Sequence, residues 1–222
     1  MASNPTFTTS MQPPPGPNTP LALPTSTTTT NQNPQTFNEA MKVRMRVFVD
    51  EQNCSATAEI DSDDPRSWHW VITDNNSNDQ PIAVIRLVPP PQPPHEHLTH
   101  PGTSPQLPEW DWNHEPCIKL TRVAVVPEYR GLGLGRRLVD TALEWASAHA
   151  GEINAAMRDV AGREGNHLKE GLGSWKGLVL VHAQVDVERM YQGQGFQTDE
   201  SLGRWDEEGI EHVGMFKRIP LA

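Results

Sequence analysis

Apolar residues recur at helical spacing in three parts of the chain, for example at Phe37, Met41, Met45 and Phe48. The predicted helices cover residues 36–51, 134–151 and 185–194. Shorter apolar runs are typical of strands, and they occur at residues 68–73, 81–88, 118–126, 178–182 and 213–219. Because strands and helices alternate along the chain, we expect an α/β (α+β) fold with a mixed sheet and helices on its faces.

Three segments lack these patterns. Residues 1–35 are rich in Pro, Thr, Ser and Asn and offer little apolar surface, so we expect a disordered tail there. Residues 89–116 are rich in Pro and His, and residues 152–177 contain several glycines. We interpret both as insertions in one domain that covers residues 36–219, because long structureless loops are uncommon in a compact domain. The second insertion could have a short helix at its start.

Composition excludes several classes of function. The net charge of −10 argues against a nucleic-acid-binding protein. No apolar run approaches the length of a membrane-spanning helix, so no membrane partner is expected. Cys54 and Cys117 lie far apart, which favours reduced thiols and a cytoplasmic or nuclear location. We expect a monomer or a homodimer.

The stretch EYRGLGLGRRL, residues 128–138, has the composition of a phosphate-binding loop. It follows a predicted strand and precedes a predicted helix, where unpaired backbone N–H groups favour an anion. Its G-x-G-x-G spacing differs from the dinucleotide pattern G-x-G-x-x-G, and no Lys-Ser or Lys-Thr pair follows as in a P-loop. The acyl-CoA-binding pattern is (Arg/Gln)-x-x-Gly-x-(Gly/Ala), and Arg130, Gly133 and Gly135 match its three defined positions. A glycine turn with a solvated arginine face is the alternative.

Three blocks of sequence carry a resemblance to a known family. They are TRVAVVPEYRGLGLGRRLVDTALEWA (residues 121–146), LVLVHAQVDVERMYQGQGF (178–196), and VRMRVFVDEQNC with EIDSDD and EEGIEHVGM. In these blocks the chain resembles the GNAT family of N-acetyltransferases and its ElaA/YjcF-like subgroup. The resemblance implies a twisted, mostly antiparallel sheet of six to seven strands, flanked by about four helices and splayed at an acyl-CoA site.

The same resemblance implies residues that bind acetyl-CoA, which is a co-substrate. The backbone of Val123 and Val125 would contact pantetheine, and N–H groups of the glycine stretch would hold the pyrophosphate. Gln184 lies where the family often has a cofactor-contacting Asn. The complete set of expected residues is Val123, Ala124, Val125, Arg130, Gly131, Leu132, Gly133, Leu134, Gly135, Arg136 and Gln184.

Acyl transfer to an amine needs a proton donor for the leaving thiolate and a base for the amine. By resemblance, Tyr191 is the donor, because Gly195 and Phe196 follow it as in the family's Tyr-x-x-x-Gly-Phe signature; a packing role is the alternative. The base stays open among several carboxylates and histidines, and a chain of ordered waters could also serve. The candidates are Glu51, Glu59, Asp61, His69, Glu208 and His212, of which Glu51 and His212 are the ones we carry forward as catalytic.

Charged residues on the first helix and histidines in the Pro-rich segment raise two further questions. Arg44 and Arg46 could orient a substrate carboxylate, but Arg46 is four residues before Asp50, which favours a pair within the helix. The histidines at positions 95, 97, 100 and 114 lack the closed ligand set of a structural metal site, so we expect no metal.

We therefore expect an N-acetyltransferase that transfers the acetyl group of acetyl-CoA to a primary amine of a small molecule or peptide, by direct attack in a ternary complex. The acidic composition favours an acceptor that is cationic in water. A non-catalytic acyl-CoA-binding or regulatory module with the same fold is the alternative, because a fold does not determine a function. An NAD-dependent oxidoreductase is the third hypothesis.

Overall fold

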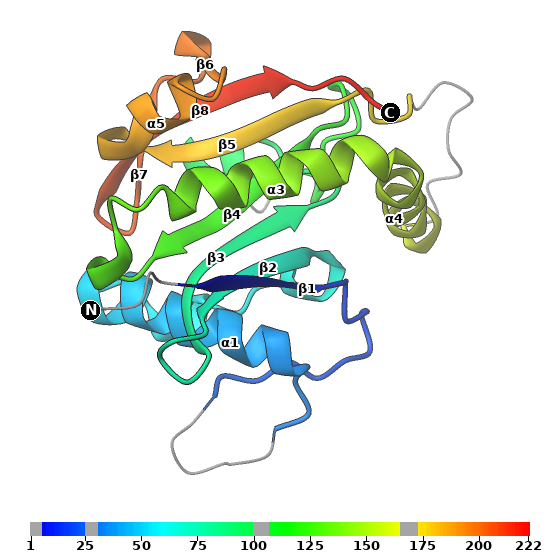
Figure 1. The fold of residues 1–222 in the computed structure, drawn as a ribbon. Coiled ribbons are helices and arrows are strands. Elements are labelled where there is room, and N and C mark those ends of the chain that lie inside the picture. The colour runs from blue at the N-terminus through cyan, green and yellow to red at the C-terminus, as the bar shows by residue number, and fades with distance from the viewer. Residues whose placement is uncertain (1–5, 25–30, 100–106, 165–172) are drawn as a thin grey trace. The chain divides into compact units, whose positions relative to one another are not determined.

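The structure is a computed structural model, and it describes residues 6–24, 31–99, 107–164 and 173–222. The α-helices are α1 (Gln35–Arg44), α2 (Glu96–Thr99), α3 (Leu134–Ala148), α4 (Ala150–Arg163) and α5 (Glu188–Gln192) (Figure 1). The strands are β1 (Phe7–Gln12), β2 (Trp68–Asp74), β3 (Gln80–Val88), β4 (Ile118–Val125), β5 (Leu178–Gln184), β6 (Gln197–Thr198), β7 (Arg204–Glu207) and β8 (Ile210–Arg218). No helix in these described ranges has both the length and the apolar composition needed to cross a membrane.

The chain forms two compact units, residues 1–88 with 121–142 and residues 89–120 with 143–222. The strand order is β1-β2-β3-β4 at one end of the sheet and β4-β5-β8-β6 at the other, with β7 paired to β8. The β4–β5 pair is parallel. The pairs β1–β2, β2–β3, β5–β8, β6–β8 and β7–β8 are antiparallel. This mixed, mostly antiparallel sheet confirms the predicted fold class, and its eight strands exceed the six to seven expected.

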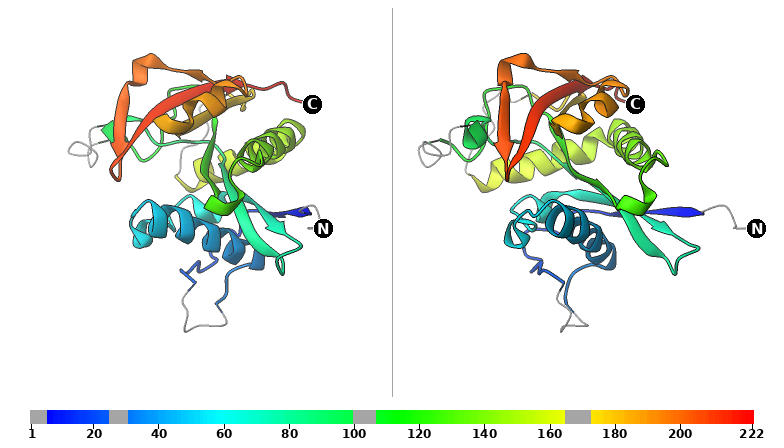
Figure 2. Two further views of the ribbon diagram at one scale, coloured as in Figure 1. Left: turned by 60° about the vertical axis from the view of Figure 1, so that its left-hand side comes forward. Right: turned by 90° about the vertical axis from the view of Figure 1, so that its left-hand side faces the viewer.

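In the first unit, α1 lies against β2 and β3 (Figures 1 and 2). Phe37 and Met41 are fully buried under the helix, as their spacing predicts. Every residue of β2 is buried, because β1 and β3 flank it and α1 packs on it. The predicted first helix is confirmed, although its last part, Met45–Glu51, winds as a π-helix.

The prediction of a disordered tail over residues 1–35 is wrong for β1. This strand pairs antiparallel with β2, from Phe7 opposite Asp74 to Gln12 opposite His69. The ring of Phe7 meets the ring of Tyr129 edge-on, with centroids 6.3 Å apart. The segment is polar because it is an edge strand, so its stability comes from pairing with β2 and not from an apolar pattern of its own.

In the second unit, β5 and β8 lie side by side and carry buried residues such as Val181 and Met215 (Figure 1). The fully buried Trp175 is anchored by two hydrogen bonds: its backbone N–H donates to Asn154 Oδ1 (2.8 Å), and its indole Nε1–H donates to the Leu178 carbonyl (2.7 Å). Asn154 lies on α4, so Trp175 joins this helix to the start of β5 through its backbone N–H and its indole.

The helix at the start of the predicted insertion 152–177 is longer than the short helix expected there. Residues 150–163 form α4, a complete helix that buries Ile153, Met157 and Val160 at helical spacing. Residues 165–172 lie outside the described residues, as do residues 100–106 of the other predicted insertion.

The last strand is longer than predicted and belongs to a hairpin. It begins at Ile210, not at Val213, and β7 pairs with it through a two-residue turn at Glu208 and Gly209. Both turn residues have positive φ, 52° and 86°, as the tight turns that suit twisted strands require. The first position of this turn is a glutamate, so the chain lacks the Asn-Gly or Asp-Gly pair that usually indicates a hairpin.

Candidate active site

The glycine stretch forms an open turn directly before α3. Gly131 and Gly133 have φ values of +80° and +75°, which side chains with a Cβ rarely adopt. A Cβ at either glycine would meet nothing within 4 Å, so space for a ligand adjoins the turn. The Arg137 N–H donates to the Gly133 carbonyl (3.0 Å), so Gly133 caps the helix. Gly133 therefore marks the N-terminus of α3, and the backbone N–H groups and dipole at a helix N-terminus suit an anion.

The side chain of Arg130 makes hydrogen bonds to two other residues of the first unit. Its Nε–H donates to the Val125 carbonyl (3.0 Å), and its Nη1 and Nη2 donate to the two carboxylate oxygens of Glu51 at 2.7 and 2.6 Å. The hydrogen bond from Arg130 lowers the pKa of Glu51, with the charges of Arg130 and Arg46 acting in the same direction. Glu51 is therefore an ionised partner of Arg130 and a weaker base than a free glutamate.

Arg46 does not pair with Asp50 as its spacing predicts. It contacts Glu128, which lies in the turn after β4. The physical reason is the π-helix at residues 45–51, because a wider turn rotates the residue four positions on away from the same face. Both ends of the π-helix thus hold the turn that precedes the glycine stretch.

Arg44 is fully buried and cannot reach a substrate. Its guanidinium donates to Glu59 (3.0 Å) and to Asp64 (2.7 and 3.3 Å). Asp64 also accepts from His69 Nε2 at 3.1 Å and from Arg86 Nη1 at 2.9 Å. Burial raises the pKa of Asp64. The charge of Arg86, the hydrogen bond from His69 and the charge of Arg44 lower it by more, so the pKa of Asp64 lies well below its usual range.

Asp61 completes this buried network. Arg86 donates to both of its oxygens (2.6 and 2.9 Å) and to the Thr121 hydroxyl (2.8 Å), and Arg122 reaches the same carboxylate at 3.3 Å. Glu59, Asp61 and His69, predicted as candidate bases, are thus engaged in holding residues 56–67 against β3 and β4. Burial also lowers the pKa of His69.

Arg122 interrupts the regular backbone of β4. Its φ of 51° lies in the left-handed region, where a non-glycine residue is strained. The side chain of Arg122 is held by the Ala58 carbonyl (3.3 Å) and by Asp61 (3.3 Å). The buried network therefore stabilises a backbone irregularity immediately before Val123 and Val125.

Tyr191 lies on α5 and is buried, with 4% of its surface exposed. Its ring packs edge-on against Phe196, with centroids 5.5 Å apart. Gly195, at φ +84°, ends the helix, and the Phe196 N–H donates back to the Tyr191 carbonyl (3.0 Å). The Tyr-x-x-x-Gly-Phe signature is thus a helix-ending motif with its hydrophobic contact. Burial raises the pKa of Tyr191, so the phenol stays protonated at neutral pH.

His212 and Gln184 face each other across the β5–β8 pair. His212 is buried, its Nδ1 lies 2.8 Å from the Ile210 carbonyl, and its ring stacks on Trp205 with centroids 6.4 Å apart. Glu208 occupies the hairpin turn. His212 and Glu208 therefore belong to the same hairpin, and Gln184 ends β5 beside it.

The sequence analysis missed His182, which lies between apolar residues of β5. Its Nδ1 lies 3.2 Å from Glu207 Oε1, and the same oxygen accepts from Trp205 Nε1 at 2.6 Å. The rings of Trp205 and His95 pack on this cluster, with centroids 4.6 Å apart. Burial and the charge of Lys119 lower the pKa of His182 to about 3, so it is neutral at pH 7. A single histidine inside the run LVLVHAQ was the available signal.

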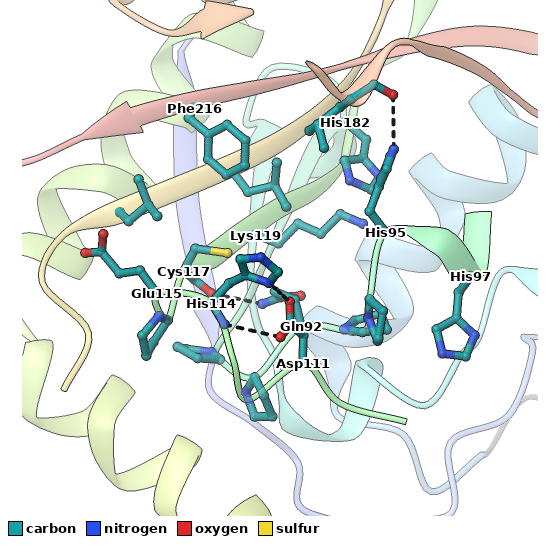
Figure 3. A pocket seen from close by; sticks show the side chains of 18 of the residues that line it. Gln92, His95, His97, Asp111, His114, Glu115, Cys117, Lys119, His182 and Phe216 are labelled. Atoms are coloured by element: carbon teal, nitrogen blue, oxygen red, sulfur yellow. Dashed lines mark hydrogen bonds and ion pairs between the residues drawn. The ribbon is translucent and has the colours of Figure 1, made fainter. Parts of the chain in front are cut away.

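His182 lines a pocket of about 820 Å³ that belongs entirely to the second unit (Figure 3). Residues 90–99 and 111–119 form much of its wall, so the Pro- and His-rich segment encloses a cavity. His95 and His97 are engaged by the carbonyls of Leu202 and Pro108, at 3.3 and 2.9 Å, and His114 pairs with Asp111. In the part of the chain that the structure describes, no group of three or more His, Cys, Asp or Glu side chains is placed to hold a metal; His100 lies outside that part.

Comparison with known proteins identifies the family. Residues 35–163 match the model of the acetyltransferase (GNAT) family. A UPF0039 protein from Synechocystis is 25% identical over 187 residues, which cover 84% of this chain and 88% of that protein.

Two solved structures share the fold. ElaA from Escherichia coli is 22% identical with a TM-score of 0.51, and the match covers 82% of this chain and 89% of that one. An acyl-CoA N-acyltransferase from Pseudomonas aeruginosa is 20% identical with a TM-score of 0.54, and covers 96% and 99%. Because the family model matches more than half of the residues, the chain belongs to the GNAT acetyltransferase family and, as a class, to the acyltransferases.

Proposed function

We propose that this protein is an N-acetyltransferase that transfers the acetyl group of acetyl-CoA to a primary amine of a small molecule or peptide, by direct attack in a ternary complex. One observation carries the proposal: two glycines with positive φ and open space beside them lead directly into the N-terminus of α3. This geometry suits the pyrophosphate of CoA, which backbone N–H groups and the helix dipole stabilise together.

In this proposal the phosphates contact the backbone of residues 131–136 more than the side chain of Arg130. Arg130 instead ties the turn to β4 and to the end of the π-helix, through Val125 and Glu51. The pantetheine arm takes hydrogen bonds from the backbone of Val123 and Val125, just beyond the irregularity at Arg122. Gln184, at the end of β5, remains the proposed side-chain contact.

The chemistry follows from the groups that the reaction needs. The amine nitrogen attacks the thioester carbonyl, a C–N bond forms, and the C–S bond breaks. Tyr191 donates a hydrogen bond to the sulfur and then its proton, so that CoA leaves as the thiol and Tyr191 regains a proton from solvent. Burial raises the pKa of Tyr191, so the phenol is protonated at neutral pH and can donate a hydrogen bond to the sulfur. The amine's proton goes to a base and then to solvent.

The experiment that tests this proposal measures acetyl-CoA binding and amine-dependent release of the CoA thiol with the same protein. We expect saturable acetyl-CoA binding that NAD does not displace, and thiol release that depends on an added primary amine. Binding without turnover on any amine of a broad panel, including peptides and polyamines, would show the non-catalytic acyl-CoA module. Binding of NAD in place of acetyl-CoA would show that the glycine stretch serves a dinucleotide.

A further inference from the structure

The pocket of the second unit has the size and the lining of a small-molecule site. Its volume of about 820 Å³ lies within the range of roughly 300–1,000 Å³ that is typical of such sites. Part of its wall is apolar and comes from β5, β8, α4 and the segment between β6 and β7. The members of this part are Met157, Leu178, Leu180, Leu202 and Phe216. The cavity therefore suits a ligand with a large apolar body.

The charged side chains around the pocket largely compensate one another. In Figure 3, Lys119 extends toward His182 and His95, and its charge is opposite to that of the exposed Glu96. The other three carboxylates of the wall have partners: Asp111 pairs with His114, Glu115 accepts from Arg218 at 2.8 Å, and Asp199 accepts from the Ser201 hydroxyl at 2.6 Å. Attraction of charge alone therefore does not select the ligand.

His182 is a buried polar group of the pocket wall, with 9% of its side chain exposed. Its partner is Glu207. Burial raises the pKa of Glu207, but the hydrogen bond and charge of His182 lower it more, so Glu207 is ionised. An ionised carboxylate only accepts, and His182 Nδ1 is therefore the donor in their 3.2 Å contact. Nε2 of the neutral imidazole then carries a lone pair.

This lone pair on His182 Nε2 is open to the pocket. Within the part of the chain that the structure describes, Nε2 makes no hydrogen bond, and it is not one of the polar atoms that are sealed from contact. The pocket thus presents a hydrogen-bond acceptor in apolar surroundings. A ligand without a donor covers this acceptor and leaves it unpaired, which costs affinity. The matching group on a ligand is an O–H or N–H donor.

The surroundings of His182 favour a neutral donor over a charged one. Burial and the charge of Lys119 lower the pKa of His182 to about 3, although Glu207 acts in the opposite direction. The same burial and the same charge disfavour an ammonium group beside Nε2. Lys119 would attract a carboxylate, but the lone pair of Nε2 and the ionised Glu207 repel it. A hydroxyl group avoids both costs.

Aromatic rings surround this acceptor. The ring of Trp205 meets the ring of His182 edge-on, with centroids 4.9 Å apart. The ring of His95 meets both of them edge-on, at 6.0 and 4.6 Å. Aromatic rings prefer such edge-to-face and offset arrangements, so an aromatic ligand can extend the cluster into the cavity.

We propose that this pocket binds a neutral aromatic ligand that carries a hydroxyl group, a phenol, and that the ligand's O–H donates to His182 Nε2. Glu207 is the positioning residue, because it selects the tautomer of His182. The pocket lies wholly in the second unit, and this binding involves neither acetyl-CoA nor a catalytic step. It is therefore independent of the function proposed above.

The test is a series of four ligands that share a naphthalene ring. 2-Naphthol carries the donor, 2-methoxynaphthalene lacks it, 2-naphthoate is an anion, and 2-naphthylmethylamine is a cation. Equilibrium dialysis against the wild-type protein should show 2-naphthol binding at least ten-fold tighter than each of the others, which corresponds to about 1.4 kcal/mol. Tighter binding of the anion or the cation would overturn the ligand class, and no binding of 2-naphthol would overturn the site.

The substitution His182→Asn tests the acceptor itself. Asparagine keeps an N–H group that can donate to Glu207 and has no atom at the position of Nε2. The variant should bind 2-naphthol and 2-methoxynaphthalene with affinities within about two-fold of each other, because the unpaired acceptor is gone. His149→Asn is the matched control and should keep the preference, because His149 lies in the second unit outside the pocket, against the Trp145 carbonyl.

A spectroscopic measurement on the wild-type protein needs no variant to fold. Magnetic resonance of isotope-labelled histidine reports the Nε2 nitrogen of His182, which should give the signal of an unprotonated imidazole nitrogen. This signal should move when 2-naphthol binds and should not move in the same direction with 2-methoxynaphthalene. An unchanged signal while 2-naphthol is bound, or a preference for 2-naphthol that survives in His182→Asn, would overturn His182 as the acceptor.

Discussion

Arg130 and Glu51 are 79 residues apart in sequence and form a two-pronged ion pair, with N–O distances of 2.7 and 2.6 Å. The pair joins the turn before the glycine stretch to the end of the π-helix. This pair bears on the roles predicted for both residues. Arg130 is held by Glu51 and by the Val125 carbonyl, and Glu51 is ionised in this pair. The roles of Arg130 as a phosphate ligand and of Glu51 as a base stay predictions.

The first prediction concerns Glu51→Gln. Since Glu51 is already ionised and bound by Arg130, its loss should leave kcat within about two-fold and cost at most about 1 kcal/mol of unfolding free energy, as for other partly exposed pairs. Steady-state kinetics across pH, with Glu128→Gln as the control, measures this. A large fall in kcat at normal acetyl-CoA affinity would restore Glu51 as the base.

The second prediction concerns the glycine turn. Gly133→Ala forces a Cβ into a backbone with φ +75°, at a cost of roughly 1–2 kcal/mol, and should weaken acetyl-CoA binding about ten-fold. Gly209→Ala is the matched control, because Gly209 also has positive φ and open space but lies in the β7–β8 turn. Equal acetyl-CoA affinity of the two variants would contradict the proposed pyrophosphate site.

The third prediction concerns the buried network around Arg44. Arg44→Met leaves the buried carboxylates of Glu59 and Asp64 without a main partner, and should cost about 3–5 kcal/mol of unfolding free energy. Arg204→Met removes an exposed pair with Glu211 and should cost less than about 1 kcal/mol. Urea unfolding compares them, and similar losses for both would show that the network does not stabilise the fold.

The fourth prediction is a pH dependence of stability. The pKa of His182 is about 3 in the folded protein and 6.5 in the unfolded chain. Between these two pH values the unfolded chain binds a proton at His182 and the folded protein does not. Stability from this group is therefore complete above pH 6.5 and declines toward pH 3, by up to about 1.4 kcal/mol per pH unit. Burial is the main cause; the charge of Lys119 and neighbouring His95 add to it, and Glu207 opposes it.

Unfolding free energies of wild type and His182→Gln at about pH 7, 6 and 5 measure this slope. The variant should lose less stability on acidification, because glutamine does not titrate. His69 titrates in both proteins and cancels in the difference. Equal slopes would mean that His182 is protonated as readily in the folded state as in the unfolded chain.

The fifth prediction concerns Tyr191→Phe. Phenylalanine keeps the edge-on packing against Phe196 and removes only the hydroxyl, so acetyl-CoA affinity should stay within about two-fold while kcat falls about 100-fold. The other tyrosine of the chain, Tyr129, donates to Asp74 at 2.8 Å and provides the control Tyr129→Phe. An unchanged kcat in Tyr191→Phe would remove the acid role from this residue and leave it as a packing aromatic.

The regular helices and strands could be predicted because their apolar residues recur at a regular spacing and the pattern stops at a definite residue. Strand β5 is an apolar run, and α3 buries Leu134, Leu138 and Ala142 on one face. The missed elements depend on partners that the local pattern does not contain. Strand β1 is held by β2, and the short strand β7 is held by β8.

The parts of the site that depend on a short sequence motif could be predicted. The parts that depend on contacts between residues far apart in the sequence could not. The glycine turn and the Tyr191 signature are local, and their backbone geometry is compatible with the roles expected of them. The partner of Arg130 and the pairing of His182 with Glu207 depend on contacts across 79 and 25 residues. Glycines at both ends of α4 also obscured an apolar period that is present in its sequence.

The most direct test of the central claim follows the acetyl group itself. The wild-type protein is incubated with acetyl-CoA that carries an isotope-labelled acetyl group and with phenethylamine as the first of a panel of primary amines, and the products are identified by mass spectrometry. We predict a labelled amide and one equivalent of free CoA thiol, with both reduced together in Gly133→Ala. Tight acetyl-CoA binding without a labelled amide from any amine would contradict the account.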